Sequence, residues 1–453
     1  MATVQELIPA PDPWEAARRF FDRPGLIFFD SAERGPKRGR YSYVAAEPRA
    51  WLSLRVGDGT DPWSGLAALL GPRRESRSDL PPFQGGVAGL FGYGLGRSIE
   101  RLPEPEFDEF RLPDLAVGVY EWVISFDHRL ERAWLVSHAD SDVTAAVRQR
   151  LVNLSQTTVR SQPSESRIDL AAPRLPLAGH AAVVSNFSRV EYESAVSRAI
   201  EYIEAGDCFQ INLSQRLATP LAEPPLALYD RLRRCNPAPF GGYFDFGLGQ
   251  VLSVSPEEFL RLRPGGEVVT RPIKGTRRRG SNPAEDFALC DDLRASEKDR
   301  AENVMIVDLL RNDLSRVCVY GTVEVPALCE RETHPTVHHL VSEVRGRLRP
   351  ECGPIDLLRA AFPGGSVTGA PKIRAMEIIT ELERVARGAY CGSLGWIGFD
   401  GAMDTSILIR TLTAAGGWLT FPVGGGIVAD SDPGQEYEET LHKAAGMLRA
   451  LAE

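Results

Sequence analysis

The sequence predicts an α+β fold whose strands are mostly antiparallel. Apolar runs of strand length recur along the chain, and helix-length apolar stripes are interspersed among them. At least one pair of strands is separated by a turn short enough for a hairpin. Helices interspersed with antiparallel hairpins are typical of an α+β architecture rather than of a doubly wound parallel sheet.

The N-terminal third alternates short apolar runs with turn signals, which predicts a sheet-rich region. The expected strands lie at residues 26–29, 51–54, 115–124 and 133–136, with a further run after Gly85-Gly86. A stretch rich in Ser, Gln, Pro and Arg follows without periodicity and is interpreted as the main linker. The predicted organisation is an N-terminal region over 1–152, a linker over 153–185 and a C-terminal region over 186–453.

The C-terminal region opens with a complete signal for the start of a helix. Ser188 and Glu191 have the spacing of a capping box. Phe187 and Tyr192 flank the box as a hydrophobic staple, and Gly206 ends the predicted helix.

The next predicted strand, CFQINLSQR, alternates between apolar and polar residues. Phe209, Ile211 and Leu213 are therefore expected on one face. The polar side chains of Gln210 and Asn212 are expected on the other. A polar strand face beside a core indicates a wet cavity.

The remaining elements are predicted from periodicity and punctuation. Strands over 251–262 and 267–276 flank a hairpin turn at Arg263-Pro264-Gly265-Gly266. Helices are predicted over 284–310, 354–361, 371–384 and 435–451, and strands near 392–399, 405–413 and 418–429.

Composition excludes several classes of protein. No apolar run approaches the roughly 18 residues of a membrane span, and the N-terminus lacks a secretory signal, so we expect a cytoplasmic protein. The seven cysteines have neither CxxC nor metal-ligand spacing, which argues against a disulfide framework and a structural zinc. The formal charge of −9 disfavours nucleic acid and anionic membranes, so local cations must hold any anionic ligand.

Two acidic pairs with helical spacing are candidates for a metal site. Asp299 and Glu302 are three residues apart, as are Glu436 and Glu439, so each pair projects from one helix face. Four carboxylates from two helices would suit a hard cation such as Mg²⁺. The alternative is two solvated helix faces.

Two basic residues and a histidine pair are further candidates. Lys443 lies one turn beyond Glu439, as either a surface ion pair or a carboxylate clamp beside the metal. Arg410 lies within the apolar run SILIRTL, where its charge needs a partner such as an anionic ligand. His338 and His339 are expected to place one ring inward and one outward.

The segment TRPIKGTRRRG places Lys274 among Arg271 and Arg277–Arg279. Repulsion between like charges would favour a neutral, nucleophilic amine, whereas the alternative is a solvated or anion-binding patch. Glu257 and Glu258 end an apolar strand near the hairpin, and one of them could be a buried general acid. The residues alone leave that choice open.

The glycine-rich loops FPGGSVTGAPK and VGGGIVAD could present backbone N–H groups to an anion. The first is not a phosphate-binding P-loop, because Ala370 stands where that motif requires lysine.

Together these segments resemble the chorismate-utilising enzyme family. The motifs occur in family order from about residue 186 to the C-terminus: SPEEF, RPIKGT, DRAENVMIVDLLRNDL, HHLVS, FPGGSVTGAPKIRAMEII, CGSLGW, DTSILIRTL and GGGIVADS. The resemblance implies two large packed antiparallel β-sheets flanked by helices, to which the N-terminal region contributes as a companion.

Within this family, the residue before Gly275-Thr276 separates branches. Anthranilate-forming members usually carry alanine there, whereas members that aminate C4 of chorismate carry the lysine seen at Lys274. Members that use water place a lysine at the position of Gln210. The resemblance therefore implies amination of chorismate at C4 with ammonia.

The resemblance also implies roles for individual residues. Lys274 would attack C2 of chorismate while Glu258 protonates the departing hydroxyl, with Thr276 and His339 in support. Mg²⁺ would be bound directly by Glu302 and Glu439, and through water by Asp299 and Glu436. The substrate carboxylates would be held by Arg410, Tyr390, Lys443, Thr368 and the backbone of Gly424, Gly425 and Gly426.

Partners are implied in the same way. Ammonia would come from a separate glutamine amidotransferase subunit, since no segment here resembles one, and the product would serve p-aminobenzoate and folate synthesis. Ser31, Pro237 and Phe240 match a tryptophan site of some relatives. The alternatives are an anthranilate-forming enzyme and a catalytically silent tryptophan-sensing relative; a nucleic-acid binder using Arg277–Arg279 is disfavoured by the acidic chain.

Overall fold

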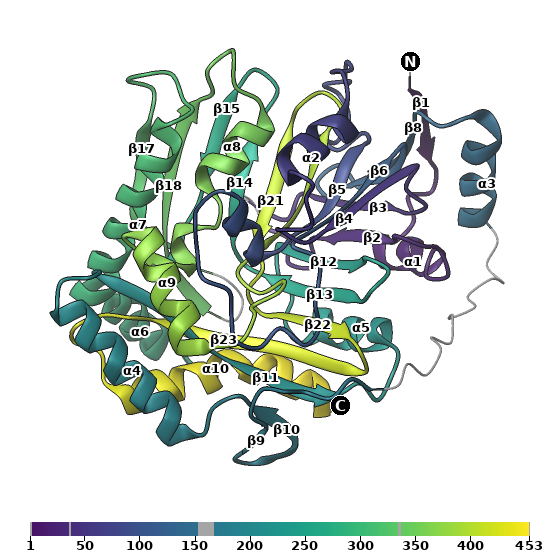
Figure 1. Cartoon of the computed structure of the whole chain (residues 1–453). Coiled ribbons are helices and arrows are strands. Elements are labelled where there is room, and N and C mark those ends of the chain that lie inside the picture. Colours follow the sequence, from purple (N-terminus) through teal and green to yellow (C-terminus); the bar gives the residue numbers. More distant parts are fainter. Residues whose placement is uncertain (1, 36–37, 153–166, 334–336, 453) are drawn as a thin grey trace.

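Two antiparallel sheets packed against each other form the centre of the molecule (Figure 1). The structure is a computed structural model that describes residues 2–35, 38–152, 167–333 and 337–452. Within the described residues, every pair of neighbouring strands in the two sheets is antiparallel. The predicted α+β class and the implied pair of packed sheets are confirmed.

The larger sheet has thirteen strands in the described part of the chain. Their spatial order is β1 (Thr3–Leu7), β8 (Arg132–Ser137), β7 (Trp122–Asp127), β3 (Tyr41–Ala45), β2 (Ile27–Asp30), β12 (Phe240–Asp245), β13 (Gln250–Ser255), β22 (Thr411–Ala415), β23 (Trp418–Ile427), β11 (Gln210–Pro220), β10 (His180–Ser185) and β9 (Leu175–Leu177), with β19 (Gly369–Ala370) paired to β11.

The smaller sheet has ten strands among the same described residues. Their order is β16 (Ile273–Arg278), β18 (Val337–Arg347), β15 (Glu267–Thr270), β14 (Glu258–Leu262), β21 (Met403–Ile407), β20 (Ser393–Gly398), β5 (Gly86–Phe91), β6 (Leu115–Tyr120) and β4 (Ala50–Leu54), with β17 (Glu324–Thr333) paired to β18. Both sheets contain strands from residues 1–152 and from residues 186–453, so the two predicted regions share one β framework.

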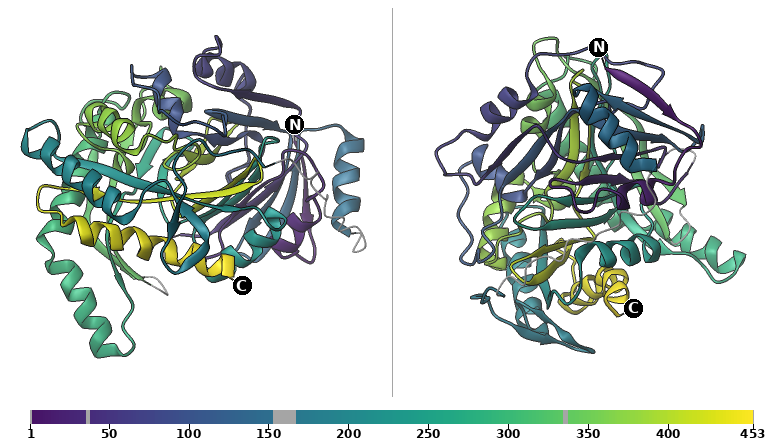
Figure 2. Two further views of the ribbon diagram at one scale, coloured as in Figure 1. Left: turned by 60° about the horizontal axis from the view of Figure 1, so that its bottom comes forward. Right: turned by 90° about the vertical axis from the view of Figure 1, so that its right-hand side faces the viewer.

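The helices cover the outer faces of the two sheets (Figures 1 and 2). Those against the smaller sheet are α2 (Pro62–Leu70), α7 (Glu297–Ser315) and α8 (Pro354–Ala361), and α6 (Pro283–Ala295) contacts its strands β16 and β18. Those against the larger sheet are α1 (Pro13–Arg18), α3 (Ser141–Val152), α5 (Pro225–Cys235) and α10 (Pro433–Ala452). Helices α4 (Arg189–Glu204) and α9 (Lys372–Glu383) pack near β11, and short 3₁₀ turns are η1 (Tyr93–Ser98) and η2 (Gly365–Val367). None of the described helices is long and apolar enough to cross a membrane.

The core between the sheets is built from the inward faces of both. Ile27, Tyr43 and Phe244 come from the larger sheet, and Leu90 and Trp396 from the smaller one. Strands buried on both faces read as continuous apolar runs rather than as alternating patterns.

This double burial explains three errors in the predicted strands. Residues 115–124, 251–262 and 405–413 were each predicted as one strand, but each is two strands in different sheets: β6 and β7, β13 and β14, and β21 and β22. The chain crosses between the sheets at Glu121, at Pro256-Glu257 and at Leu408–Arg410. Arg410 has φ +51 at its crossing, so it is not inside a strand as predicted.

The sequence signals at helix ends and turns predicted the structure more reliably than the apolar runs did. The Ser188 side chain accepts from Glu191 N, and the Glu191 side chain accepts from Ser188 N, so the capping box at the start of α4 is confirmed. The staple rings of Phe187 and Tyr192 lie 5.8 Å apart. The hairpin at 263–266 joins β14 to β15.

Three other predictions need correction. The helix predicted over 284–310 is two helices, because Ser296 leaves the helical conformation (ψ 106) and caps α7 through Asp299 N. Phe209 is 71% exposed, since it precedes β11 rather than continuing its buried face. Part of the predicted linker, 175–185, forms strands β9 and β10, while 153–166 lies outside the described residues.

Candidate active site

Lys274 lies where the ends of the two sheets meet. Its side chain on β16 is 11% exposed, and Nζ lies 3.8 Å from Glu302 Oε2 on α7. A Cβ built on Gly426 of β23 would lie 3.4 Å from this Nζ and 2.0 Å from Gln210 Nε2. Glycine at 426 therefore leaves the space in which the amine and the amide face each other.

The arginines near Lys274 in the sequence all form ion pairs. Each has a carboxylate partner: Arg271 with Glu332 and Glu343, Arg277 with Asp292 and Asp299, Arg278 with Glu285, and Arg279 with Asp286. Because these ion pairs neutralise the arginines, the expectation that repulsion between like charges would favour a neutral Lys274 amine is not supported.

Glu257, rather than Glu258, faces Lys274. It lies at the crossing between β13 and β14 and is 4% exposed. Burial raises the pKa of Glu257, against hydrogen bonds from the Ser366 side chain and Ile273 N–H and the nearby charge of Lys274. A buried carboxyl with a raised pKa beside a lysine is a candidate general acid.

Glu258 points to a different environment. Its Oε1 lies 3.3 Å from Arg261 Nη1 and is buried without a hydrogen-bond partner among the described residues. Burial, followed by the charge of Glu258, raises the pKa of Asp404 to about 8. The two adjacent glutamates therefore have different neighbours: the charge of Lys274 acts on Glu257, and Glu258 lies beside Arg261.

Gln210 contributes a polar group to the same space, as its strand face predicted. Its Nε2 donates to Glu302 Oε2 at 3.3 Å. Its Oε1 is buried and has no hydrogen-bond partner in the described part of the chain. Buried acceptors are nearly always satisfied in proteins, so this oxygen is free to accept from a ligand.

Thr276 and His339 are brought together as predicted. They are cross-strand neighbours on β16 and β18, and Thr276 Oγ1 lies 2.9 Å from His339 Nδ1. His338 points to the other side, where Nε2 lies 3.0 Å from Asp286 Oδ1. Both rings are 2% exposed, so the expectation of one outward ring is wrong because α6 covers the second face.

The acidic pair on α7 is partly buried. The Glu302 side chain is 12% exposed, and burial raises the pKa of Glu302 although the charges of Lys274 and Lys298 act against it. Asp299 Oδ2 lies 3.2 Å from Arg277 Nη2. Glu302 is therefore not on a solvated helix face, which was the alternative reading of this pair.

The acidic pair on α10 faces the same region. Glu436 is 4% exposed, accepts from Ser431 Oγ at 2.7 Å and lies 3.4 Å from Lys298 Nζ. Glu439 lies 2.6 Å from Lys443 Nζ. Burial would raise the pKa of Glu439, but the charges of Lys443 and Lys298 hold it below its usual value.

Lys298 lies near acids from both helices. Its Nζ is 3.4 Å from Glu436 Oε1 on α10, and the charges of Glu302 on α7 and Glu439 on α10 also raise the pKa of Lys298. Within the described residues no group of three or more His, Cys, Asp or Glu side chains is already arranged to hold a metal ion. The donors are nevertheless all carboxylate oxygens, the chemistry that Mg²⁺ prefers.

The glycine triplet of β23 forms the wall between these groups. A Cβ on Gly425 would lie 3.1 Å from Glu436 Oε2 and 3.4 Å from Glu439 Oε1. Lys443 Nζ donates to Gly424 O at 2.8 Å. Since neighbouring residues of a strand point to opposite faces, Gly425 opens space toward the carboxylates, and Gly426 opens space toward Lys274.

The three other predicted substrate ligands lie on loops around this space. Burial lowers the pKa of Arg410, with Glu33 and Glu257 nearby, and its guanidinium forms no ion pair with any residue in the described ranges. Tyr390 is 7% exposed, and burial raises its pKa. Thr368 is fully buried, and its hydroxyl donates to the carbonyl oxygen of Gly364 at 3.2 Å.

The predicted tryptophan residues are also brought together, in the larger sheet. Ser31 Oγ lies 3.0 Å from Pro239 O and 2.7 Å from Tyr41 O. Phe240 begins β12, which pairs with β2, so Pro237 and Phe240 lie on the segment next to Ser31. The Ser31 hydroxyl is engaged by the protein's own backbone.

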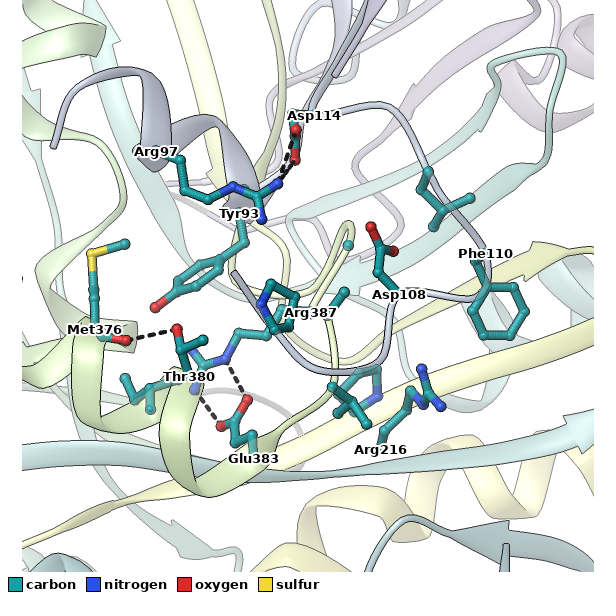
Figure 3. Close-up of a pocket in the computed structure, with 18 of the residues that line it drawn as sticks. Tyr93, Arg97, Asp108, Phe110, Asp114, Arg216, Met376, Thr380, Glu383 and Arg387 are labelled. Carbon is teal, nitrogen blue, oxygen red and sulfur yellow. Dashed lines mark hydrogen bonds and ion pairs between the residues drawn. The ribbon is translucent and has the colours of Figure 1, made fainter. Parts of the chain in front are cut away.

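Sequence reasoning missed a second polar region, shown in Figure 3. A cavity of about 70 Å³ is lined by residues that include Tyr93, Arg216, Glu383 and Arg387. The spacing of Glu383 and Arg387 in ELERVARG was the available signal, but an i,i+4 pair is far more often a surface feature.

Two packed antiparallel sheets thus frame a polar space that contains a largely buried lysine and several carboxylates. The model of the chorismate binding enzyme family matches residues 27–449, so the chain belongs to this family. It is a chorismate-utilising enzyme.

Individual relatives are similar over nearly the whole chain. Aminodeoxychorismate synthase component 1 of Salmonella typhimurium is 41% identical, covering 97% of each chain. Anthranilate synthase component 1 of Thermus thermophilus is 42% identical, covering 94% of this chain and 92% of that protein. The crystal structure of anthranilate synthase component I from Streptococcus pneumoniae superposes with a TM-score of 0.76 at 33% identity, covering 92% of this chain and 93% of the other.

Proposed function

We propose that this enzyme aminates chorismate at C4 with ammonia and releases 4-amino-4-deoxychorismate. The observation that carries the proposal is Lys274, a lysine side chain only 11% exposed that lies between Glu302 and the glycine wall of β23. Relatives named aminodeoxychorismate synthase component 1 support the same reaction.

The first half of the reaction would form a covalent intermediate. The Lys274 amine attacks C2 of the ring, the ring double bond shifts, and the bond between C4 and its hydroxyl oxygen breaks. Glu257 gives its proton to the departing hydroxyl, which leaves as water, and then takes a proton from the Lys274 nitrogen, which is now bonded to C2. The raised pKa of Glu257 supports this assignment.

The second half would reverse the allylic shift. Ammonia attacks C4, the double bond returns, and the bond between C2 and the lysine nitrogen breaks. Glu257 protonates the departing lysine amine and accepts a proton from the new ammonium group. The sum is chorismate plus ammonia giving the 4-amino product and water.

Gln210 is placed to hold the incoming ammonia. Its Oε1 is an acceptor without a hydrogen-bond partner among the described residues, and ammonia is a small donor that would fit it. Family members that use water carry a lysine at the position of Gln210. Thr276 and His339, hydrogen-bonded to each other, would support the ring and the departing group.

The carboxylates of α7 and α10 fit Mg²⁺. Glu302 and Glu439 would bind the ion directly, with Asp299 and Glu436 bonding through water. The bound ion would neutralise a substrate carboxylate and the negative charge of the surrounding acids.

Substrate anchoring would fall to the cations and backbone around the cavity. Arg410, which has no ion pair among the described residues, and Lys443 would bind carboxylates of chorismate. Tyr390, Thr368 and the N–H groups of Gly424–Gly426 would complete the binding site. Arg410 and Lys443 supply local positive charge in a chain whose net charge is −9.

Ammonia would come from a separate glutamine amidotransferase. The name "component 1" of the relatives supports a second component. Tryptophan, as in some members of the family, would bind at Ser31, Pro237 and Phe240, where the Ser31 hydroxyl lies within hydrogen-bond distance of Tyr41 O and Pro239 O.

An anthranilate-forming reaction is the second candidate, supported by the similarity to the Thermus thermophilus protein. Lys274 opposes it, because an elimination that yields anthranilate does not need a nucleophile at this position.

The test is incubation of the purified chain with chorismate, Mg²⁺ and an ammonium salt at mildly alkaline pH, with the products separated by mass. A non-aromatic amino-chorismate is the expected product. Fluorescent anthranilate would move the chain to the second candidate. Unreacted chorismate, in the presence or absence of a glutaminase, would contradict both.

A further inference from the structure

The cavity in Figure 3 lies beside a buried ion pair that the proposed reaction does not use. The side chains of Glu383 and Arg387 are 1% and 3% exposed. Arg387 donates to both carboxylate oxygens, at 2.6 and 2.9 Å. Such a two-bond pair fixes geometry closely, but a buried ion pair is weak evidence for stability, so its role needs another explanation.

The remaining donors of Arg387 bridge two segments that carry proposed substrate ligands. Nη1 donates to Val367 O at 3.0 Å, next to Thr368. Nη2 donates to Asn212 O at 2.6 Å, on the strand that presents Gln210. The guanidinium therefore joins the loop before β19 to the polar strand β11.

Glu383 adds a second connection to the same strand. Its Oε1 accepts from Ser214 N–H and from Ser214 Oγ, each at 2.8 Å. Because Glu383 holds Arg387 and Ser214 together, the ion pair fixes the register of β11 against the loop.

Aromatic rings complete the environment of Arg387. Its guanidinium carbon lies 5.6 Å from the ring centroid of Tyr390 and 4.6 Å from that of Tyr93. Cation–π contacts of this kind orient both rings. The Tyr93 hydroxyl is buried and, within the described residues, has no hydrogen-bond partner.

We propose that Arg387, held by Glu383, is a positioning residue that fixes Tyr390, Thr368 and Gln210 at the start of β11 in the geometry that binds chorismate. It does not touch the substrate itself. The inference rests on the proposed placement of chorismate beside Tyr390 and Thr368.

The chain provides a matched control in Arg216. This arginine lines the same cavity and donates two hydrogen bonds to Glu109, at 3.0 and 3.1 Å. The side chain of Arg216 is 5% exposed and that of Glu109 is 6% exposed, so this ion pair is also buried. Its guanidinium lies over Phe110 rather than over a proposed substrate ligand. Loss of either arginine removes a buried ion pair, but only loss of Arg387 releases the substrate-binding segments.

The experiment compares the steady-state kinetics of Arg387→Ala and Arg216→Ala. Arg387→Ala is expected to raise the KM for chorismate about tenfold or more, since misplaced binding groups lose affinity. Arg216→Ala is expected to change this KM by less than about twofold, while both variants lose similar thermal stability. A KM that is unchanged, or equally changed in both variants, would overturn the inference.

Chemical rescue separates positioning from general damage. The truncated side chain would enlarge the cavity of about 70 Å³, so added guanidinium ion at low millimolar concentration should lower the KM of Arg387→Ala toward the wild-type value. Urea, which has no charge, should not. Failure of guanidinium to lower this KM, or an equal effect of urea, would count against a specific role.

Two further points keep the test decisive. If the alanine variant does not fold, Arg387→Lys keeps the charge without the planar fork and is expected to show the same rise in KM. Because the readout is the KM for chorismate, Arg387 is tested whether the product is the 4-amino compound or anthranilate. Failure of the inference is thus distinct from failure of the proposed reaction.

Discussion

At the scale of single residues, Lys274 decides whether amination proceeds through a covalent intermediate or by direct attack of ammonia. Lys274→Ala is expected to lower kcat about 1000-fold or more, because loss of a nucleophile removes the route rather than one contact. Chorismate binding should remain. Steady-state kinetics and mass spectrometry of the quenched enzyme, which should show a chorismate-derived adduct only in the wild type, would measure both.

Lys372 gives a control for this substitution. Its side chain is 14% exposed and pairs with Asp313 at 2.7 Å, so it is a similarly buried lysine in an ion pair. Lys372→Ala should keep kcat within a few fold of the wild type. Near-normal turnover by Lys274→Ala would remove the lysine from its nucleophilic role.

Glu257 and Glu258 form a natural pair of neighbours for assigning the general acid. Glu257→Gln is expected to lower kcat about 100-fold or more, in line with the usual contribution of a general acid. Glu258→Gln should leave kcat nearly unchanged, since Glu258 faces Arg261 and Asp404. The reverse result would restore Glu258 as the acid.

At the scale of elements, the acidic faces of α7 and α10 matter only as a pair. Each helix alone presents two carboxylates with helical spacing, a pattern found on many solvated helices. Packing against the ends of β16 and β23 directs the two faces toward one region, where Lys298 interacts with acids from both helices.

Glu439→Gln tests this arrangement. The substitution keeps the shape of the side chain but removes its charge, so the Mg²⁺ concentration for half-maximal activity is expected to rise about tenfold or more. Calorimetric titration of Mg²⁺ should show the same loss of affinity. Glu438→Gln is the control, because Glu438 is on the same helix but pairs with Arg189 at the surface. An unaltered titration in Glu439→Gln would argue against the two-helix site.

At the scale of the whole molecule, the repeated crossing of the chain between sheets buries charged residues within the framework. Asp404, on β21, is half-buried among them, and desolvation followed by the charge of the neighbouring Glu258 raises its pKa to about 8. A folded-state pKa above the unfolded value means that the native state binds more protons over this range. The resulting stability is fully present below about pH 4 and is lost as the pH rises to about 8.

The free energy of unfolding should therefore fall between about pH 4 and pH 8, and Asp404→Asn should flatten part of that fall. Urea unfolding at a series of pH values measures the slope. Asp308→Asn is the control, since that side chain is 78% exposed. A wild-type slope that survives in Asp404→Asn would show that other groups cause it.

The sequence by itself determined the fold class and many local starts and stops, and it named several side chains that the structure brings close together. The capping box at Ser188, the hairpin at 263–266 and helix α8 were readable because each depends on neighbours within a few residues. Family motifs also placed Lys274, Thr276, His339 and the two acidic pairs in one enzyme.

Only the tertiary structure decided which sheet each apolar run joins and which way each functional side chain points. A strand covered on both faces carries no alternation, so the sequence could not reveal the crossings at Glu121, Pro256 and Arg410. For the same reason Glu257 and Glu258 were indistinguishable until the crossing turned one toward Lys274. The role proposed for Arg387 could not be predicted from the sequence, because it depends on hydrogen bonds to Asn212 O and Val367 O. These residues are distant in sequence, and only packing brings them to one guanidinium.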